Sequence, residues 1–335
     1  MLNGRSRLYP IVYLTALALS YTSALADPAP KPLGKLVDLG GHQLHVHCSG
    51  HGSPIVVVEN GLGDFSFDWV LVQSRAEMFT RICTYDRAGY AWSTPGPLPR
   101  SFDQINLELR DALRKLGEKG PYVLVGHSYG GPVMRNFALT YPKDTAGLVL
   151  VDAAFEGMRV QVGASKTIRL GDGAQLRDIP APHEQMQASD KPPAHRPGPV
   201  ESTLEPLYAA LPPADRKLQL WAQQQQAIQD AEDSQREWSG QFFARQLAHP
   251  QTGSLDGLPL IVLTRSSGGY DGDLDVPAAQ LEQERKDGQA ALARLSSNSI
   301  QIFLNCGHNM DLEDPSGVTA AIRRIVEAVR DNKRL

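Results

Sequence analysis

Short apolar runs alternate with amphipathic segments along most of the chain. The runs at 55–58, 122–125 and 148–151 contain no charged residue, which is typical of strands buried on both faces of a parallel sheet. Between two of them, residues 103–116 place their apolar side chains on one face of a helix. The alternation predicts an α/β fold with a mostly parallel sheet flanked by helices.

The alternation is interrupted between residues 155 and 257. This segment is rich in proline, glutamine and charge, and contains one long helical stretch near 214–247. Strand and helix patterns return after it. We therefore predict that residues 27–154 and 258–335 are the two parts of one core, and that residues 155–257 form a helical lid inserted between them.

Turn and capping residues mark the ends of several predicted elements. Glycine-rich turns separate strand-like runs at 36–39, 43–48 and 55–58, and this spacing predicts a leading β-meander. Ser101 and Gln104 are placed as a capping box for the helix that follows them.

The N-terminus has the pattern of a secretory signal peptide. Arg5 and Arg7 precede a mostly apolar stretch at 11–19, and Ala24-Leu25-Ala26 fits a cleavage site. We expect residues 1–26 to be removed and the protein to be secreted or periplasmic. An uncleaved anchor is the alternative, but the apolar stretch is too short to span a bilayer comfortably.

Composition and charge exclude several classes of function. Of the 335 residues, 41% are hydrophobic and 21% are charged, which is ordinary for a globular protein. The net charge of −4 offers no electrostatic reason to approach nucleic acid or an anionic membrane. We expect a small-molecule substrate and, after signal cleavage, no stable membrane span.

The segment Gly126-His127-Ser128-Tyr129-Gly130 matches the G-x-S-x-G nucleophile elbow. Its context fits, since an apolar strand enters it and a helix leaves it. The sharp turn needs glycine beside the nucleophile to avoid side-chain clashes. Ser128 is the candidate nucleophile, and His127, whose side chain should point away from it, is interpreted as structural.

With this motif, the chain resembles the α/β-hydrolase superfamily, in particular serine esterases and lipases, over nearly all of its mature length outside the lid. The segment 85–93 is similar to a loop that follows the fourth strand in many members. The resemblance implies a catalytic triad, because a serine hydroxyl needs a base and a group that orients the base.

The resemblance places the base at His308, just after the last strand. Two candidates remain for the acid. Asp152 directly follows the strand at 148–151, whereas Asp273 lies beyond the next strand in a D-x-x-V-P segment. Both preserve the order serine, acid, histidine. Asp152 is favoured because the connection to Asp273 is unusually long.

Acyl transfer also needs an oxyanion hole with two aimed donors. One is the backbone amide of Tyr129, which follows the nucleophile. By position in the family, the second is the amide of Leu62, in the loop Asn60-Gly61-Leu62-Gly63 after the third strand. The family's His-Gly is replaced here by Asn-Gly.

The cysteines and the N-terminal histidines are weighed separately. In the family's fold, the strands that carry Cys48 and Cys83 are neighbours, and an exported protein can keep a disulfide. We predict that these two are bonded and that Cys306 is an unpaired thiol without a nucleophilic role. His45 and His47 share a strand face but lack further ligands, so no metal site is expected.

The resemblance implies hydrolysis of a carboxylic ester or related acyl bond through an acyl-enzyme on Ser128, with no metal or organic cofactor. Serine at the elbow argues against dehalogenase and epoxide hydrolase chemistry, where aspartate is the nucleophile. Lactone, thioester, amide or carbon–carbon bond hydrolysis with the same triad is the alternative within enzymes. A catalytically silent binding protein on this fold is the alternative outside them.

Overall fold

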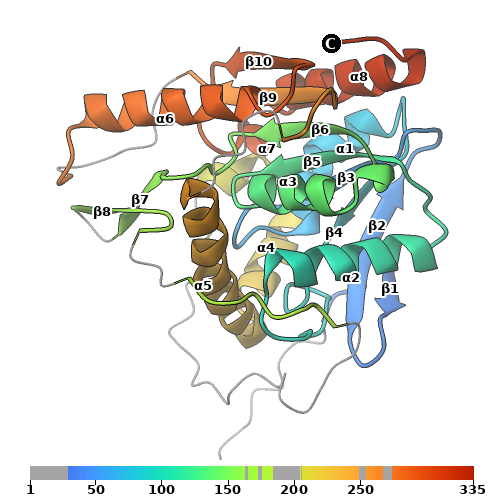
Figure 1. Ribbon diagram of the computed structural model, residues 1–335. Coiled ribbons are helices and arrows are strands. Elements are labelled where there is room, and N and C mark those ends of the chain that lie inside the picture. The colour runs from blue at the N-terminus through green and yellow to red at the C-terminus, as the bar shows by residue number, and fades with distance from the viewer. Residues whose placement is uncertain are drawn as a thin grey trace, which may run out of the picture. The chain divides into compact units, whose positions relative to one another are not determined.

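Eight strands form the central sheet of the computed structural model within the residues that it describes, in the order β1-β2-β4-β3-β5-β6-β9-β10 (Figure 1). The described residues are 29–162, 165–172, 176–183, 204, 206–248, 254–266 and 274–335. The sheet strands are β1 (Lys35–Asp38), β2 (Gln43–Ser49), β3 (Val56–Glu59), β4 (Ile82–Tyr85), β5 (Tyr122–His127), β6 (Thr145–Val151), β9 (Leu260–Arg265) and β10 (Ser299–Leu304). Strands β1 and β2 are antiparallel to their neighbours, and all later pairings are parallel.

Helices cover both faces of this sheet. They are α1 (Val70–Ala76), α2 (Phe102–Lys115), α3 (Gly130–Thr140), α6 (Ala278–Ala293), α7 (Met310–Glu313) and α8 (Pro315–Asp331), with 3-10 turns at Ser66–Trp69 and Pro142–Asp144. Alternate strand residues point to opposite faces. Thus Val123 and Val149 pack with α1 and α8, whereas Leu124 and Leu148 pack with α2 and α3. The predicted fold class is confirmed.

The leading strands depart from a simple meander. β1 and β2 form an antiparallel pair, but β2 then pairs with β4, and β3 lies on the far side of β4. The prediction is wrong for the third strand because β3, which is apolar from Val56 to Val58, is buried between two parallel neighbours. Its connection to β4 runs through α1, which the sequence analysis did not predict.

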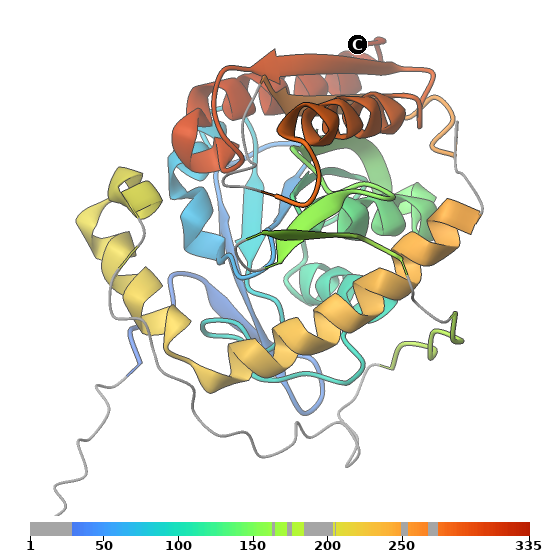
Figure 2. The ribbon, with the colours of Figure 1, turned by 90° about the vertical axis from the view of Figure 1, so that its left-hand side faces the viewer.

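The inserted segment contains helices α4 (Pro213–Gln223) and α5 (Gln226–Ala248), a 3-10 turn at Pro206–Ala210, and a hairpin of β7 (Arg159–Val162) and β8 (Lys166–Arg169). Figures 1 and 2 show the hairpin lying beside α5. The prediction of one long helical stretch near 214–247 is therefore wrong, because two helices occupy this range, and the strand pair was not predicted. No glycine or proline marks the break; it is set by packing, because Ala222 and Ile228 on either side of it join one apolar cluster with Phe65 and Trp92.

Ser101 caps α2 as predicted, but only half of the capping box forms. The Ser101 hydroxyl accepts a hydrogen bond from the Gln104 amide at 3.2 Å. The Gln104 side chain instead binds Glu108 and the backbone carbonyl of His183, so a contact outside the helix replaces the reciprocal bond. At α8, the Asp314 carboxylate accepts from the Gly317 amide at 2.9 Å.

Cys48 and Cys83 are joined by a disulfide, as expected. They are direct partners across the antiparallel β2–β4 pair. Cys306 is a free, half-buried thiol, and burial raises its pKa to about 11. A thiol in that environment is a poor nucleophile.

Removing the disulfide with Cys48→Ala and Cys83→Ala together is expected to lower the free energy of unfolding. The bond closes a loop of sequence separation 35, for which chain entropy predicts a loss of about 3 to 4 kcal/mol. Urea denaturation of both proteins measures it. Cys306→Ala, which leaves the disulfide intact, should cost about 1 kcal/mol or less; an equal loss in both variants would contradict the prediction.

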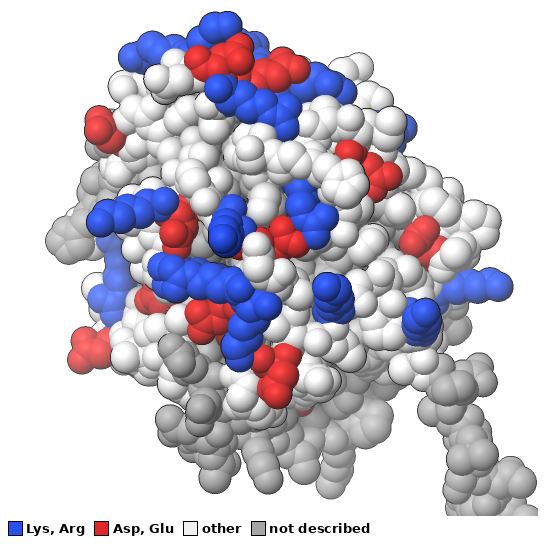
Figure 3. All heavy atoms as spheres, turned by 90° about the vertical axis from the view of Figure 1, so that its right-hand side faces the viewer, with Lys and Arg blue, Asp and Glu red and all other residues white. Residues whose placement is uncertain are grey.

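Acidic and basic side chains are intermingled across the molecular face in Figure 3. This distribution fits the small net charge of −4 and gives that face no extended basic patch of the kind that binds nucleic acid. Within the described residues, no helix combines the length and apolar character needed to cross a membrane. The predicted signal segment at 1–26 lies outside the described residues.

Candidate active site

Ser128 lies in a sharp turn between β5 and α3. Its φ angle is +50°, a left-handed conformation uncommon for a residue with a side chain. A Cβ on Gly126 would lie 2.4 Å from the Gly130 carbonyl oxygen, and one on Gly130 would lie 2.4 Å from the Glu59 carbonyl oxygen. Both glycines are therefore sterically required, in agreement with the reasoning from the motif.

The structure brings Ser128, His308 and Asp152 together where the parallel strands end. His308 Nε2 lies 3.0 Å from Oγ of Ser128, and its Nδ1 lies 2.6 Å from Oδ2 of Asp152. Asp152 is buried, whereas the His308 side chain is 32% exposed. A base placed in this way can take the serine proton while the carboxylate holds its other ring nitrogen.

Asp152 is the candidate acid that contacts His308, and the other candidate, Asp273, lies outside the described residues. Asp152 follows β6 with a φ angle of +36°, and its amide donates to the Leu263 carbonyl on β9 at 2.9 Å. The backbone therefore holds its side chain toward His308. Oδ1 of Asp152 is buried without a hydrogen-bond partner among the described residues.

Burial and neighbouring charges act in opposite directions on this pair. Burial alone would raise the pKa of Asp152, but the hydrogen bond from His308, the charge of His308 and the charge of Arg265 outweigh it, so the pKa is lowered. Burial lowers the pKa of His308, and the opposing hydrogen bond to Asp152 does not restore it. The resting pair is thus an ionised carboxylate beside a neutral imidazole, the state needed for a general base.

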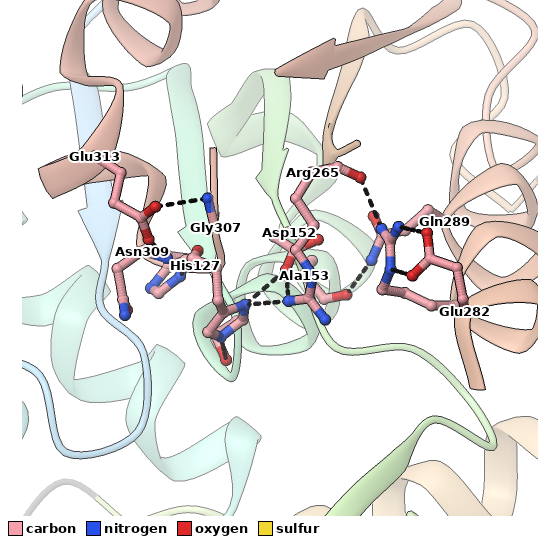
Figure 4. Close-up of polar contacts among 12 residues, drawn as sticks. His127, Asp152, Ala153, Arg265, Glu282, Gln289, Gly307, Asn309 and Glu313 are labelled. Atoms are coloured by element: carbon pink, nitrogen blue, oxygen red, sulfur yellow. Dashed lines mark hydrogen bonds and ion pairs between the residues drawn. The ribbon is translucent and has the colours of Figure 1, made fainter. Parts of the chain in front are cut away.

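Three hydrogen bonds hold the backbone around His308. The Glu313 carboxylate on α7 accepts hydrogen bonds from the amides of Gly307 at 2.6 Å and Asn309 at 3.3 Å (Figure 4). The carbonyl of His308 lies 3.0 Å from Nε2 of His127. Glu313 was not among the predicted site residues. The signal in the sequence was its position five residues after the predicted base and directly before the Asp314-Pro315 start of the last helix.

His127 makes polar contacts that its interpretation as a structural residue did not anticipate. Burial would lower the pKa of His127, but its hydrogen bond toward Asp64 and the charges of Asp311 and Asp64 raise it to about 9. Its Nδ1 lies 3.4 Å from Oδ2 of Asp64. The charged ring can therefore donate to the His308 carbonyl and face Asp64 at once, which links the loop after β3 to the loop of His308.

The two expected oxyanion-hole residues lie in one apolar cluster. Tyr129 is buried at the start of α3, and Leu62 packs against the same group of side chains. Arg87 fixes the loop that carries Leu62: it donates to the carbonyls of Asn60 at 2.9 Å and Gly61 at 2.7 Å. It also pairs with buried Glu59 at 2.6 Å. The Gly61 carbonyl and the Leu62 amide belong to one planar peptide group, so holding this carbonyl fixes the direction of the Leu62 N–H.

Arg87 belongs to the segment 85–93, which is similar to the loop after the fourth strand in the family. The other residues of this segment contact the surrounding elements: Tyr85 binds Glu59, and Asp86 accepts from the Ser66 amide and contacts Nδ1 of His45 at 2.7 Å. His45 is thus fully engaged by Asp86 and by the Gly34 amide.

Within the described residues, one group of potential metal ligands lies close together, formed by Cys48, Cys83 and Glu118. Both sulfur atoms are in the disulfide, and disulfide sulfur is not a thiolate ligand. His45 and His47 are not part of a cluster in the residues searched. This group offers no donor set that suits a metal ion.

A sequence model of the alpha/beta hydrolase family matches residues 43–322. The chain belongs to this family. The match extends from β2 to α8 and includes the elbow, Asp152 and His308. It establishes a hydrolase family and fold, while the bond that is cleaved must be argued from the site.

The curated relatives of this chain are matched over only part of their length. The chain is 33% identical over 156 residues to the uncharacterized protein YqjL of Bacillus subtilis (strain 168), which covers 46% of this chain and 54% of that protein. It spans 18% and 44% of the length of two further curated relatives.

Solved structures extend the likeness to nearly the whole chain. A thermophilic esterase from Thermogutta terrifontis has a TM-score of 0.60 at 18% identity and covers 88% of this chain and 99% of that chain. The epoxide hydrolase CorEH has a TM-score of 0.58 at 16% identity and covers 88% of this chain and 99% of that chain. At these identities the likeness establishes only the fold. The two similar structures, an esterase and an epoxide hydrolase, carry out different reactions.

Proposed function

We propose that this hydrolase is a serine hydrolase that cleaves a carboxylic ester or related acyl bond through an acyl-enzyme on Ser128. The observation that carries the proposal is the continuous contact from Ser128 Oγ to His308 Nε2 and from His308 Nδ1 to Asp152, at 3.0 and 2.6 Å. No metal or organic cofactor takes part. The base is held ready by burial, which keeps the imidazole neutral.

In the first half-reaction, Oγ of Ser128 attacks the acyl carbon while Nε2 of His308 takes the serine proton. The negative charge on the carbonyl oxygen is stabilised by the amides of Leu62 and Tyr129. The tetrahedral intermediate collapses, the carbon–oxygen bond to the leaving group breaks, and His308 returns the proton to the departing alkoxide. Water, deprotonated by His308, then releases the acid and restores Ser128.

The nucleophile favours acyl transfer over epoxide opening, although an epoxide hydrolase shares the fold. A serine at the elbow forms an acyl ester that His308 and water can hydrolyse. The similar structure from Thermogutta terrifontis is an esterase, which points the same way. Lactone, thioester or amide hydrolysis would use the same steps with a different leaving group.

We further propose that the enzyme works outside the cytoplasm. The disulfide between Cys48 and Cys83 supports this location, since such bonds persist in oxidising compartments. The signal-like segment at 1–26 is consistent with export. Cell fractionation together with N-terminal sequencing of the recovered protein tests the location and the expected start at Asp27.

The test of the proposed activity is turnover of short-chain and long-chain p-nitrophenyl esters, together with labelling by a fluorophosphonate. We expect ester turnover, and a covalent phosphonyl adduct on Ser128 that mass spectrometry locates in the peptide containing the elbow. Labelling of Ser128 without ester turnover would support the serine nucleophile and indicate that the substrate is another acyl compound. Absence of both in the folded protein would contradict the serine mechanism and favour a binding protein.

A further inference from the structure

Arg265 contacts both the acid and the base of the proposed triad. Its Nη1 donates to Oδ2 of Asp152 at 2.5 Å and lies 3.1 Å from Nδ1 of His308. Figure 4 shows this guanidinium against the Asp152 carboxylate. Ser-His-Asp catalysis does not itself require an arginine here, so the contact needs its own explanation.

The sheet topology places Arg265 at this point. It is the last residue of β9, the parallel neighbour of β6, and Asp152 directly follows β6. The two residues therefore end adjacent strands at the same edge of the sheet. Arg265 is 3% exposed, so little solvent screens its charge from Asp152.

Helix α6 forms hydrogen bonds to the backbone at the end of β9 and after β6. Arg285 donates to the backbone carbonyl of Arg265 at 2.9 Å and is itself paired with Glu282 at 2.6 Å. Gln289, one turn further along, donates to the carbonyl of Ala153 at 2.7 Å. The residues after β6 and at the end of β9 are thus tied to one helix, so the spacing between Asp152 and Arg265 is fixed by the fold.

One oxygen of Asp152 is shared between two donors. The Nδ1–H of His308 and the Nη1–H of Arg265 both point to Oδ2. A buried carboxylate beside an imidazole favours the protonated imidazole, and a cation on the same oxygen offsets that influence. The carboxylate can then orient the ring without holding it in the charged form.

We propose that Arg265 is a positioning residue of the triad: its guanidinium fixes Oδ2 of Asp152 and offsets the negative charge of this carboxylate beside His308. The inference rests on the proposed triad. Its consequence is an imidazole that stays neutral, and so able to accept the serine proton, at lower pH than an ordinary aspartate-paired histidine. The charge of Arg265 is among the influences that lower the pKa of His308, after burial and the charge of His127.

Several other charged groups face His308 and must stay constant in a test. The set consists of Asp152 after β6, His127 at the end of β5, Glu313 on α7 and, through His127, Asp64 and Asp311. Burial raises the pKa of Asp311 to about 6, so this carboxylate can titrate in the same range. A comparison of Arg265 variants leaves all of these residues in place.

The experiment compares wild type, Arg265→Met, Arg265→Lys and Arg135→Met. Arg135 is a matched control, because it is also buried and paired with a carboxylate, that of Glu156, away from the triad. Two readouts are used. The first is the pH dependence of the rate constant for fluorophosphonate labelling, and the second is an NMR titration of the His308 ring, assigned with His308→Gln.

In Arg265→Met we expect the pKa of His308 to rise by about 1, since the carboxylate charge is no longer offset. The protonated ring cannot accept the serine proton, so labelling on the acid side should slow by up to about tenfold, with little change above about pH 8. Arg265→Lys, which keeps the charge, should stay near wild type. Arg135→Met should not move the midpoint.

An unchanged midpoint in folded Arg265→Met, or an equal movement in Arg135→Met, would overturn the inference. Arg265→Gln replaces Arg265→Met if the latter does not fold by circular dichroism. The wild-type protein also tests the inference. If Arg265 offsets the charge of Asp152, the pKa of His308 measured by NMR should not lie above the ordinary range of histidine. The NMR titration needs no substrate, so failure of the proposed esterase activity and failure of this inference give different results.

Discussion

Ester hydrolysis by Ser128→Ala is expected to fall by about 10⁵-fold to 10⁶-fold in kcat. The substitution removes the attacking oxygen and leaves His308 without its 3.0 Å partner, so no acyl-enzyme can form. Stopped assays with a p-nitrophenyl ester measure the loss, and fluorophosphonate labelling should vanish with it. Substrate binding can persist, because the loop of Leu62 is held by Arg87 rather than by the serine.

A second serine provides the control for this loss. Ser74 is exposed on α1, away from the elbow, and its hydroxyl contacts only the Leu71 carbonyl among the described residues. Ser74→Ala should retain wild-type turnover and labelling. If ester turnover survived in Ser128→Ala at more than a few per cent, attack by another nucleophile would have to replace the mechanism proposed here.

The fold, and the contact between the two ends of the proposed triad, could be predicted from sequence because their signals are local. The elbow needs glycines at fixed offsets, and the clashes at Gly126 and Gly130 are consequences of that turn alone. His308 follows a recognisable last strand. The disulfide between Cys48 and Cys83 could be predicted because the strands that carry them are neighbours in the fold of the family.

The other features depend on contacts between distant segments. Asp152 and Arg265 meet because β6 and β9 are neighbours in the sheet, and the long segment between them in sequence gives no sign of this pairing. The break between α4 and α5 depends on the apolar cluster around Phe65 rather than on a helix-breaking residue. The charge of His127 depends on Asp64 and Asp311, which no sequence spacing connects to it.

The choice between Asp152 and Asp273 can be decided by a pair of matched substitutions. We expect Asp152→Asn to lower kcat by about 10⁴-fold, because an amide cannot stabilise the imidazolium or hold the ring in the required tautomer. Asp273→Asn should change kcat by about twofold or less, because the proposed mechanism assigns no step to this residue. Both are measured with one p-nitrophenyl ester at the pH optimum of wild type.

Asp152→Asn can lower activity through lost stability as well as through lost catalysis, because Asp152 is also paired with Arg265. Asp152→Asn leaves that buried guanidinium without its carboxylate, and breaking a buried pair costs about 3 to 5 kcal/mol of stability. The assay must therefore run well below the midpoint of a thermal melt recorded for each variant. Under that condition, a large loss confined to Asp152→Asn makes it the triad acid. A large loss confined to Asp273→Asn would instead mean that the contact between Asp152 and His308 is a structural one, and that the acid is supplied from beyond β9.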